Sequence, residues 1–140
     1  MTATIVDFRN HFRQYGWAFE EPEESADLML TGFVDSQERS FAIVITLSET
    51  FVTFALPYAP LPSEGRWCES LEQMMRLNYE WPIAKLSLDE EKALLVSVEL
   101  PRDGLVYEHF VIALDLLVEA VETLAEQLPD VIPEREDEDE

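Results

Sequence analysis

The most constraining feature of the sequence is a long apolar seam close to its C-terminal end. Six apolar side chains recur there at steps of four, three, four, three and four residues: Phe110, Leu114, Leu117, Val121, Leu124 and Leu128. This spacing places them along one side of an α-helix. Five acids fall on the opposite side: Glu108, Asp115, Glu119, Glu122 and Glu126. The pattern predicts a helix over residues 105–128.

Packing, more than local charge, decides whether this helix forms. Like charges four residues apart cost about 0.2–0.5 kcal/mol per pair, whereas fully burying one leucine contributes about 1.5–3 kcal/mol. Burial therefore outweighs the repulsion along the acidic side. The rest of the chain has to supply elements that cover the seam.

A first helix is predicted near the N-terminal end. Apolar side chains recur at three- and four-residue steps over residues 4–15, and Gly16 follows as a stop signal. The next stretch, residues 20–27, holds five acids and one proline without a basic residue. Such a composition is typical of a solvated loop.

Residues 28–56 are rich in β-branched and aromatic types, and polar clusters interrupt them at hairpin spacing. This pattern predicts a three-stranded antiparallel meander. We expect Pro57, Pro60 and Pro62 to end the third strand, because proline cannot donate a hydrogen bond to a strand ladder.

A second helix is predicted before Pro82. Its sequence Ser70-Leu-Glu-Gln73 has the spacing of a capping box, which either begins the helix or lies inside one that starts near Ser63. Residues 83–88 and 93–100 then alternate between apolar and polar side chains and predict a two-stranded hairpin.

Together these elements predict a single α+β domain over residues 1–128, built as helix, three-strand antiparallel meander, helix, two-strand hairpin and long C-terminal helix. Residues 129–140 end in six acids and one base, and we expect them to form a disordered acidic tail.

The charge of the chain excludes several classes of partner. Thirty acidic residues face nine basic ones, so the formal net charge is −21. Phosphate backbones and anionic membrane surfaces would repel such a chain. The N-terminal residues do not have the pattern of a secretory signal, and no apolar stretch approaches a membrane span. With a single cysteine, the composition fits a protein of the cytoplasm.

No catalytic, metal-binding or cofactor-binding motif is present in the sequence. The four glycines form no phosphate-binding loop, and neither His11 nor His109 has a second histidine four residues away. Acids surround Cys68, and they would raise the pKa of a thiol and make it a poor nucleophile. We therefore predict no catalytic residue, no metal ligand and no cofactor.

The sequence instead favours protein binding. Trp67 and Trp81 flank the second helix, and Met74 and Met75 lie within it, a mixture that suits an adaptable contact surface because thioethers repack easily. Ordinary core filling is the alternative for these four residues. On the last helix, Asp115, Glu119 and Glu122 are the candidates for contact with a partner.

The order of elements resembles that of the YbjN-like family and of the type III secretion chaperones. The resemblance covers nearly all of residues 4–128 and includes Leu77-Asn78, the strand Lys85-Leu-Ser-Leu-Asp89, Val98-Glu-Leu-Pro101 and the acidic last helix. It implies an antiparallel sheet packed by the first and last helices, with the second helix available for dimer contact. Secretion chaperones of this fold are small acidic homodimers that hold an extended segment of a client protein. YbjN-like proteins are bacterial, and the family supplies no catalytic residues.

Three functional hypotheses follow. The first is a cytoplasmic, homodimeric and non-enzymatic module that binds another protein as a chaperone or regulatory adaptor. The second is an acidic mimic of nucleic acid that occupies the basic groove of another protein. The third is a metal-dependent hydrolase that uses clustered acids, which no motif in the sequence requires.

Overall fold

The computed structural model describes residues 2–23, 26–60, 67–129 and 131–133, and within them the predicted order of helices and strands is confirmed. The elements are α1 (Ile5–Tyr15), β1 (Leu28–Val34), β2 (Ser40–Leu47), β3 (Phe51–Pro60), α2 (Trp67–Glu80), β4 (Lys85–Leu88), β5 (Ala93–Pro101) and α3 (Tyr107–Gln127).

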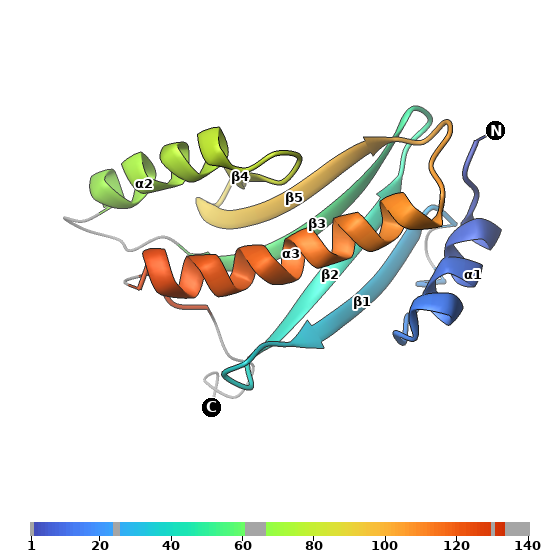
Figure 1. Cartoon of the computed structure of the whole chain (residues 1–140), viewed down its shortest axis with the longest axis horizontal. Helices are drawn as coiled ribbons and strands as arrows, with labels where there is room; N and C mark the ends of the chain where they lie inside the picture. Colours follow the sequence, from blue (N-terminus) through green and yellow to red (C-terminus); the bar gives the residue numbers. More distant parts are fainter. Residues whose placement is uncertain (1, 24–25, 61–66, 130, 134–140) are drawn as a thin grey trace.

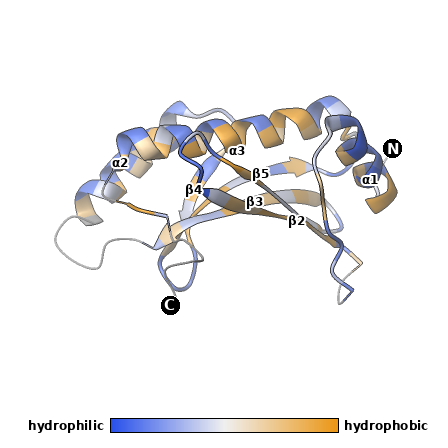
Figure 2. Ribbon diagram, turned by 90° about the horizontal axis from the view of Figure 1, so that it is seen from below, coloured by the Kyte–Doolittle hydropathy of each residue, from blue (hydrophilic) through white to orange (hydrophobic). Residues whose placement is uncertain are grey.

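The five strands form one antiparallel sheet in the order β1-β2-β3-β5-β4. α3 crosses one face of this sheet, with α1 near one end of α3 and α2 near the other (Figure 1). The described helices all lie toward the same side of the sheet, and its other face is left without a helix (Figure 2). The fold is therefore a two-layer α+β arrangement, as the sequence predicts.

The predicted seam of α3 forms the centre of the core. Phe110, Leu114, Leu117, Val121 and Leu124 are completely buried, and Leu128 is nearly so. They belong to one hydrophobic cluster with the buried side chains of the sheet. On the opposite side of α3, the acids of the predicted stripe are all exposed.

α1 begins and ends at residues that satisfy the free backbone groups of a helix. Thr4 is the N-cap, and its side chain and that of Asp7 form a reciprocal capping box. Gly16 ends the helix with a left-handed φ of 89°, a conformation that glycine adopts without strain. Phe8 and Phe12 are completely buried and attach α1 to the core.

The prediction that Pro57 ends the third strand is wrong. β3 continues through Pro57 to Pro60, with a register shift against β5 between Pro57 and Ala59. Pairing between β2 and β3 stops at Val44 and Ala55, so Pro57 has no described strand partner on that side. Proline is tolerated at such a bulge next to an unpaired edge, because no ladder hydrogen bond is lost there. Pro62 lies outside the described residues.

α2 begins at Trp67, so the sequence Ser70-Leu-Glu-Gln73 lies inside the helix and does not cap it. Ser70 is buried. Of the two interpretations of this sequence, the one that places it inside a longer helix is the correct one, although residues 61–66 lie outside the described part of the chain.

The core extends slightly beyond the domain boundary predicted at residue 128. Val131 is only 2% exposed and belongs to the hydrophobic cluster, and its backbone N–H donates to the carbonyl of Leu128. The acidic residues 134–140 of the predicted tail lie outside the described residues.

Candidate functional site

The largest exposed apolar side chains of α2 lie one turn apart on the same side of the helix. Met75 is 69% exposed and Tyr79 is 91% exposed, and Ile83, just after the helix, is 48% exposed. Side chains four residues apart on a helix are neighbours. We call Met75, Tyr79 and Ile83 the α2 surface.

The α2 surface is held beside an edge of the sheet. The amide side chain of Asn78 donates to the backbone carbonyl of Leu86 at 3.0 Å and accepts from its N–H at 2.6 Å. Leu86 lies in β4, the last strand of the sheet. Because one side chain makes both bonds to one backbone position, α2 is fixed relative to the edge strand.

The other residues predicted around α2 lie elsewhere. Met74 is only 4% exposed and belongs to the core, because its helix position is rotated by about 100° from that of Met75. Trp81 is half-buried and packs against the core. The side chain of Trp67 lies outside the described part of the structure. Core filling, the alternative considered for this group, therefore describes Met74 and much of Trp81.

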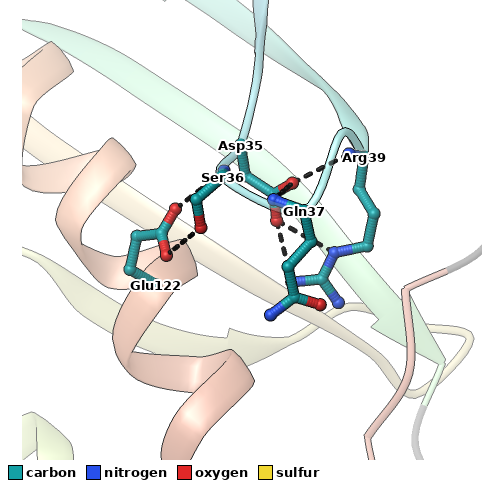
Figure 3. Close-up of polar contacts among 5 residues, drawn as sticks. All are labelled: Asp35, Ser36, Gln37, Arg39 and Glu122. Carbon is teal, nitrogen blue, oxygen red and sulfur yellow. Dashed lines mark hydrogen bonds and ion pairs between the residues drawn. The ribbon is translucent and has the colours of Figure 1, made fainter.

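The acids of α3 divide into two kinds. Asp115 accepts a hydrogen bond of 2.7 Å from the hydroxyl of Tyr15 in α1. Glu122 accepts from the backbone N–H of Ser36 at 3.1 Å and from its hydroxyl at 2.8 Å (Figure 3). Glu119, between them on the same side of α3, is exposed and makes no hydrogen bond or ion pair with the described residues. Two of the three predicted acids thus connect α3 to other elements.

The turn between β1 and β2 is built around the carboxylate of Asp35, which is 1% exposed. It accepts from the backbone N–H groups of Gln37 and Arg39, and the guanidinium of Arg39 pairs with it at 2.8 Å (Figure 3). Burial works to raise the pKa of Asp35, but the hydrogen bonds from Arg39 and Gln37 outweigh it, so the pKa lies below its ordinary value.

Five aromatic rings form a continuous row beside this turn. Ring centroids are 5.2 Å apart for Tyr15 and Trp17, 5.9 Å for Trp17 and Phe33, 5.6 Å for Phe33 and Phe41, and 5.7 Å for Phe41 and Tyr58. We call these residues the aromatic row. Phe41 and Tyr58 are buried, whereas the first three rings are partly exposed.

Both ends of the aromatic row lie close to charged groups. At one end, burial and then the hydrogen bond to Asp115 raise the pKa of Tyr15. Near the other end, the Arg39 guanidinium lies 5.9 Å from the centre of the ring of Phe41, which stacks on the last ring, Tyr58, within the range of a cation–π interaction.

Some of these features could be predicted from the sequence, and others could not. Tyr79 could be found from its position four residues after Met75, which places both on one side of the helix. The aromatic row carries no local signal, because its members come from the end of α1, the segment that follows α1, β1, β2 and β3. The bond between Ser36 and Glu122 joins residues 86 positions apart, which no spacing rule predicts.

No group of three or more His, Cys, Asp or Glu side chains among the described residues is placed to hold a metal ion. Among the helices in the described ranges, none is both long and apolar enough to cross a membrane.

The chain matches the model of a known protein family. The profile of the YbjN family, described as "Putative bacterial sensory transduction regulator", matches residues 5–129. No curated protein sequence is a significant match.

The solved structures that share the fold include YbjN and chains of type III secretion complexes. YbjN from E. coli, described as "a putative transcription regulator", is 18% identical with a TM-score of 0.68, covering 91% of this chain and 96% of that chain. A chain of the heterodimeric ExoU–SpcU complex from the type III secretion system of Pseudomonas aeruginosa is 20% identical with a TM-score of 0.63, covering 87% and 96%. A chain of the Yersinia pestis type III secretion chaperone SycH in complex with a fragment of YscM2 is 14% identical with a TM-score of 0.59, covering 85% and 97%. The resemblance of the sequence to this fold is confirmed.

Proposed function

The chain belongs to the YbjN family, and from this premise we propose that it is a non-enzymatic protein-binding module that acts as a homodimer in the cytoplasm, as a chaperone or regulatory adaptor. Two of the solved structures with this fold are complexes between different proteins. The likeness supports a binding role, and the surfaces of this chain indicate which residues would carry it.

The observation that carries the proposal is the exposure of the α2 surface. Met75 and Tyr79 together hold a thioether and a phenol ring in contact with water, and burial against another apolar surface would release that water. Tyr and Met are both enriched at protein interfaces. Since Asn78 fixes α2 beside β4, the surface is presented rigidly, which lowers the entropy cost of association.

We propose that a second copy of the chain covers the α2 surface. A mass measurement by light scattering after gel filtration tests this: the expected result is about twice the 16.1 kDa of one chain. The variant Met75→Ser/Tyr79→Ser should elute as a monomer with unchanged circular dichroism. A monomeric wild-type protein would refute the dimer.

A control comes from the part of α3 that lies away from α2 (Figure 1). Ile112, on α3, is 44% exposed, and Ile112→Ser removes exposed apolar surface outside the α2 surface. This variant should remain dimeric. Dissociation of both variants would show that general loss of apolar surface, and not the α2 surface, controls assembly.

The mimicry of nucleic acid stands as a second candidate, favoured by the net charge of −21. It predicts that partner affinity falls steeply with added salt and with neutralisation of Asp115, Glu119 and Glu122. An apolar interface predicts affinity that persists in salt. Measuring partner binding at low and high ionic strength separates the two functions.

A further inference from the structure

We propose that the exposed part of the aromatic row and the neighbouring carboxylate of Glu119 form a docking strip for arginine side chains of a partner protein. The strip consists of Trp17, Phe33 and Glu119. This inference rests on the proposed function, because it specifies the chemistry of the protein that the module binds.

Two contacts place the strip beside α3. Tyr15, next to Trp17 in the row, donates to Asp115, and Ser36, just after β1, donates to Glu122. Glu119 lies between these two acids on the same side of α3. Glu119 therefore lies between the two positions where α3 is bound, one to the end of α1, two residues before Trp17, and the other to the turn that follows β1, the strand of Phe33.

The buried part of the same row already holds an arginine. The guanidinium of Arg39 lies over the Phe41 ring, with 5.9 Å between the guanidinium carbon and the ring centroid, and pairs with the carboxylate of Asp35 at 2.8 Å. Phe33, the next ring along the row, stacks on Phe41 at 5.6 Å. The proposed strip would offer the same chemistry on the surface, because Trp17 and Phe33 are partly exposed, Glu119 is exposed, and no cation of the described residues pairs with Glu119.

The chemistry favours arginine over lysine. A guanidinium is planar, so it stacks on a ring while its N–H groups reach a carboxylate, and it is more weakly hydrated than an ammonium. The net charge of −21 attracts basic partners of both kinds. Preference for arginine at equal charge therefore separates the strip from general attraction.

The test uses the full-length protein and two fluorescent peptides, one of alternating arginine and serine and one of alternating lysine and serine, with binding measured by anisotropy at low salt. We expect the arginine peptide to bind more tightly than the lysine peptide. Glu119→Gln and Trp17→Leu should each weaken the arginine peptide by about two- to fivefold, as expected for one exposed ion pair or one exposed cation–π contact.

The control variant is Glu90→Gln, which removes the same charge from the exposed turn between β4 and β5, at the opposite edge of the sheet from β1. It should leave the affinity for the arginine peptide within the measurement error. Equal affinity for the two peptides, or equal effects of Glu119→Gln and Glu90→Gln, would overturn the proposal.

The peptide-binding test of the docking strip and the assembly test of the proposed function can fail independently. Met75→Ser/Tyr79→Ser changes assembly and leaves the strip intact, so this variant should still prefer the arginine peptide. A dimeric wild-type protein without that preference would refute the docking strip and leave the homodimeric binding module standing.

Discussion

The buried ion pair of the β1–β2 turn offers the sharpest test of the structure. Replacing Asp35 with asparagine keeps the size of the side chain and one oxygen that can accept from the backbone, but it removes the charge opposite Arg39. The Arg39 side chain is 13% exposed and the Asp35 side chain 1%, so the guanidinium would be left largely desolvated without its partner. Breaking a buried pair from one side costs about 3–5 kcal/mol.

We expect Asp35→Asn to lie near the lower end of this range, about 3 kcal/mol, because Arg39 keeps some contact with water and with the Phe41 ring. This corresponds to a fall of roughly 10 °C in Tm. Urea unfolding at neutral pH, followed by circular dichroism, measures the free energy of unfolding directly.

The double variant Asp35→Asn/Arg39→Met tests whether the unpaired guanidinium of Arg39 causes the loss of stability. If the unpaired guanidinium is responsible, removing it should recover part of the stability that Asp35→Asn loses. Ser36→Ala, in the same turn, removes an exposed hydrogen bond to Glu122 and should cost no more than about 1 kcal/mol. A loss below about 1 kcal/mol for Asp35→Asn, or a double variant less stable than either single one, would refute the reasoning.

Three further predictions concern the sheet, one histidine and the total charge. A Cβ atom at Gly32 would lie 2.5 Å from the carbonyl oxygen of Phe41, so Gly32→Ala should destabilise the protein by about 1–3 kcal/mol in urea unfolding, and an unchanged midpoint would contradict the close approach. Burial lowers the pKa of His11 despite the opposing charges of Asp7 and Glu108, so the unfolded state binds the proton more tightly than the folded state. The free energy of unfolding should therefore fall as the pH drops below about 6.5, the ordinary pKa of histidine. The variant His11→Phe should show a weaker dependence of stability on pH. With a net charge of −21, added salt should raise Tm by screening repulsion, and a calorimetric scan without such a rise would contradict the exposure of the acids.

The sequence predicts the α3 seam and α1 well because both depend on local periodicity. A helix that is apolar along one side has few ways to avoid water, so Phe110 and Leu117 could be assigned to the core before any coordinates were known. The passage of β3 through Pro57 could not be predicted in this way. It depends on where β2 stops pairing, which is set by the whole sheet and not by the residues around the proline.

The exposure of the candidate contact residues also depends on the whole fold and not on the local sequence alone. Met74 and Met75 are adjacent and chemically identical, yet one is 4% and the other 69% exposed. Composition marks both as candidates, and only the rotation of α2 about its axis, fixed by the bonds of Asn78 to β4, separates them. A surface defined by residue type alone therefore mixes core and contact positions.

The acids of α3 also differ in role although they are alike in sequence. The sequence presents Asp115, Glu119 and Glu122 as equivalent members of one stripe, but two of them accept hydrogen bonds that hold α1 and the β1–β2 turn against α3. Neutralising those two would therefore weaken the attachments of α3 as well as remove charge, so the joint neutralisation of the three acids has to be compared with that of Glu119 alone. Glu119 makes no such bond with the described residues, so it is the position where charge can be removed from the stripe while the attachments of α3 stay in place.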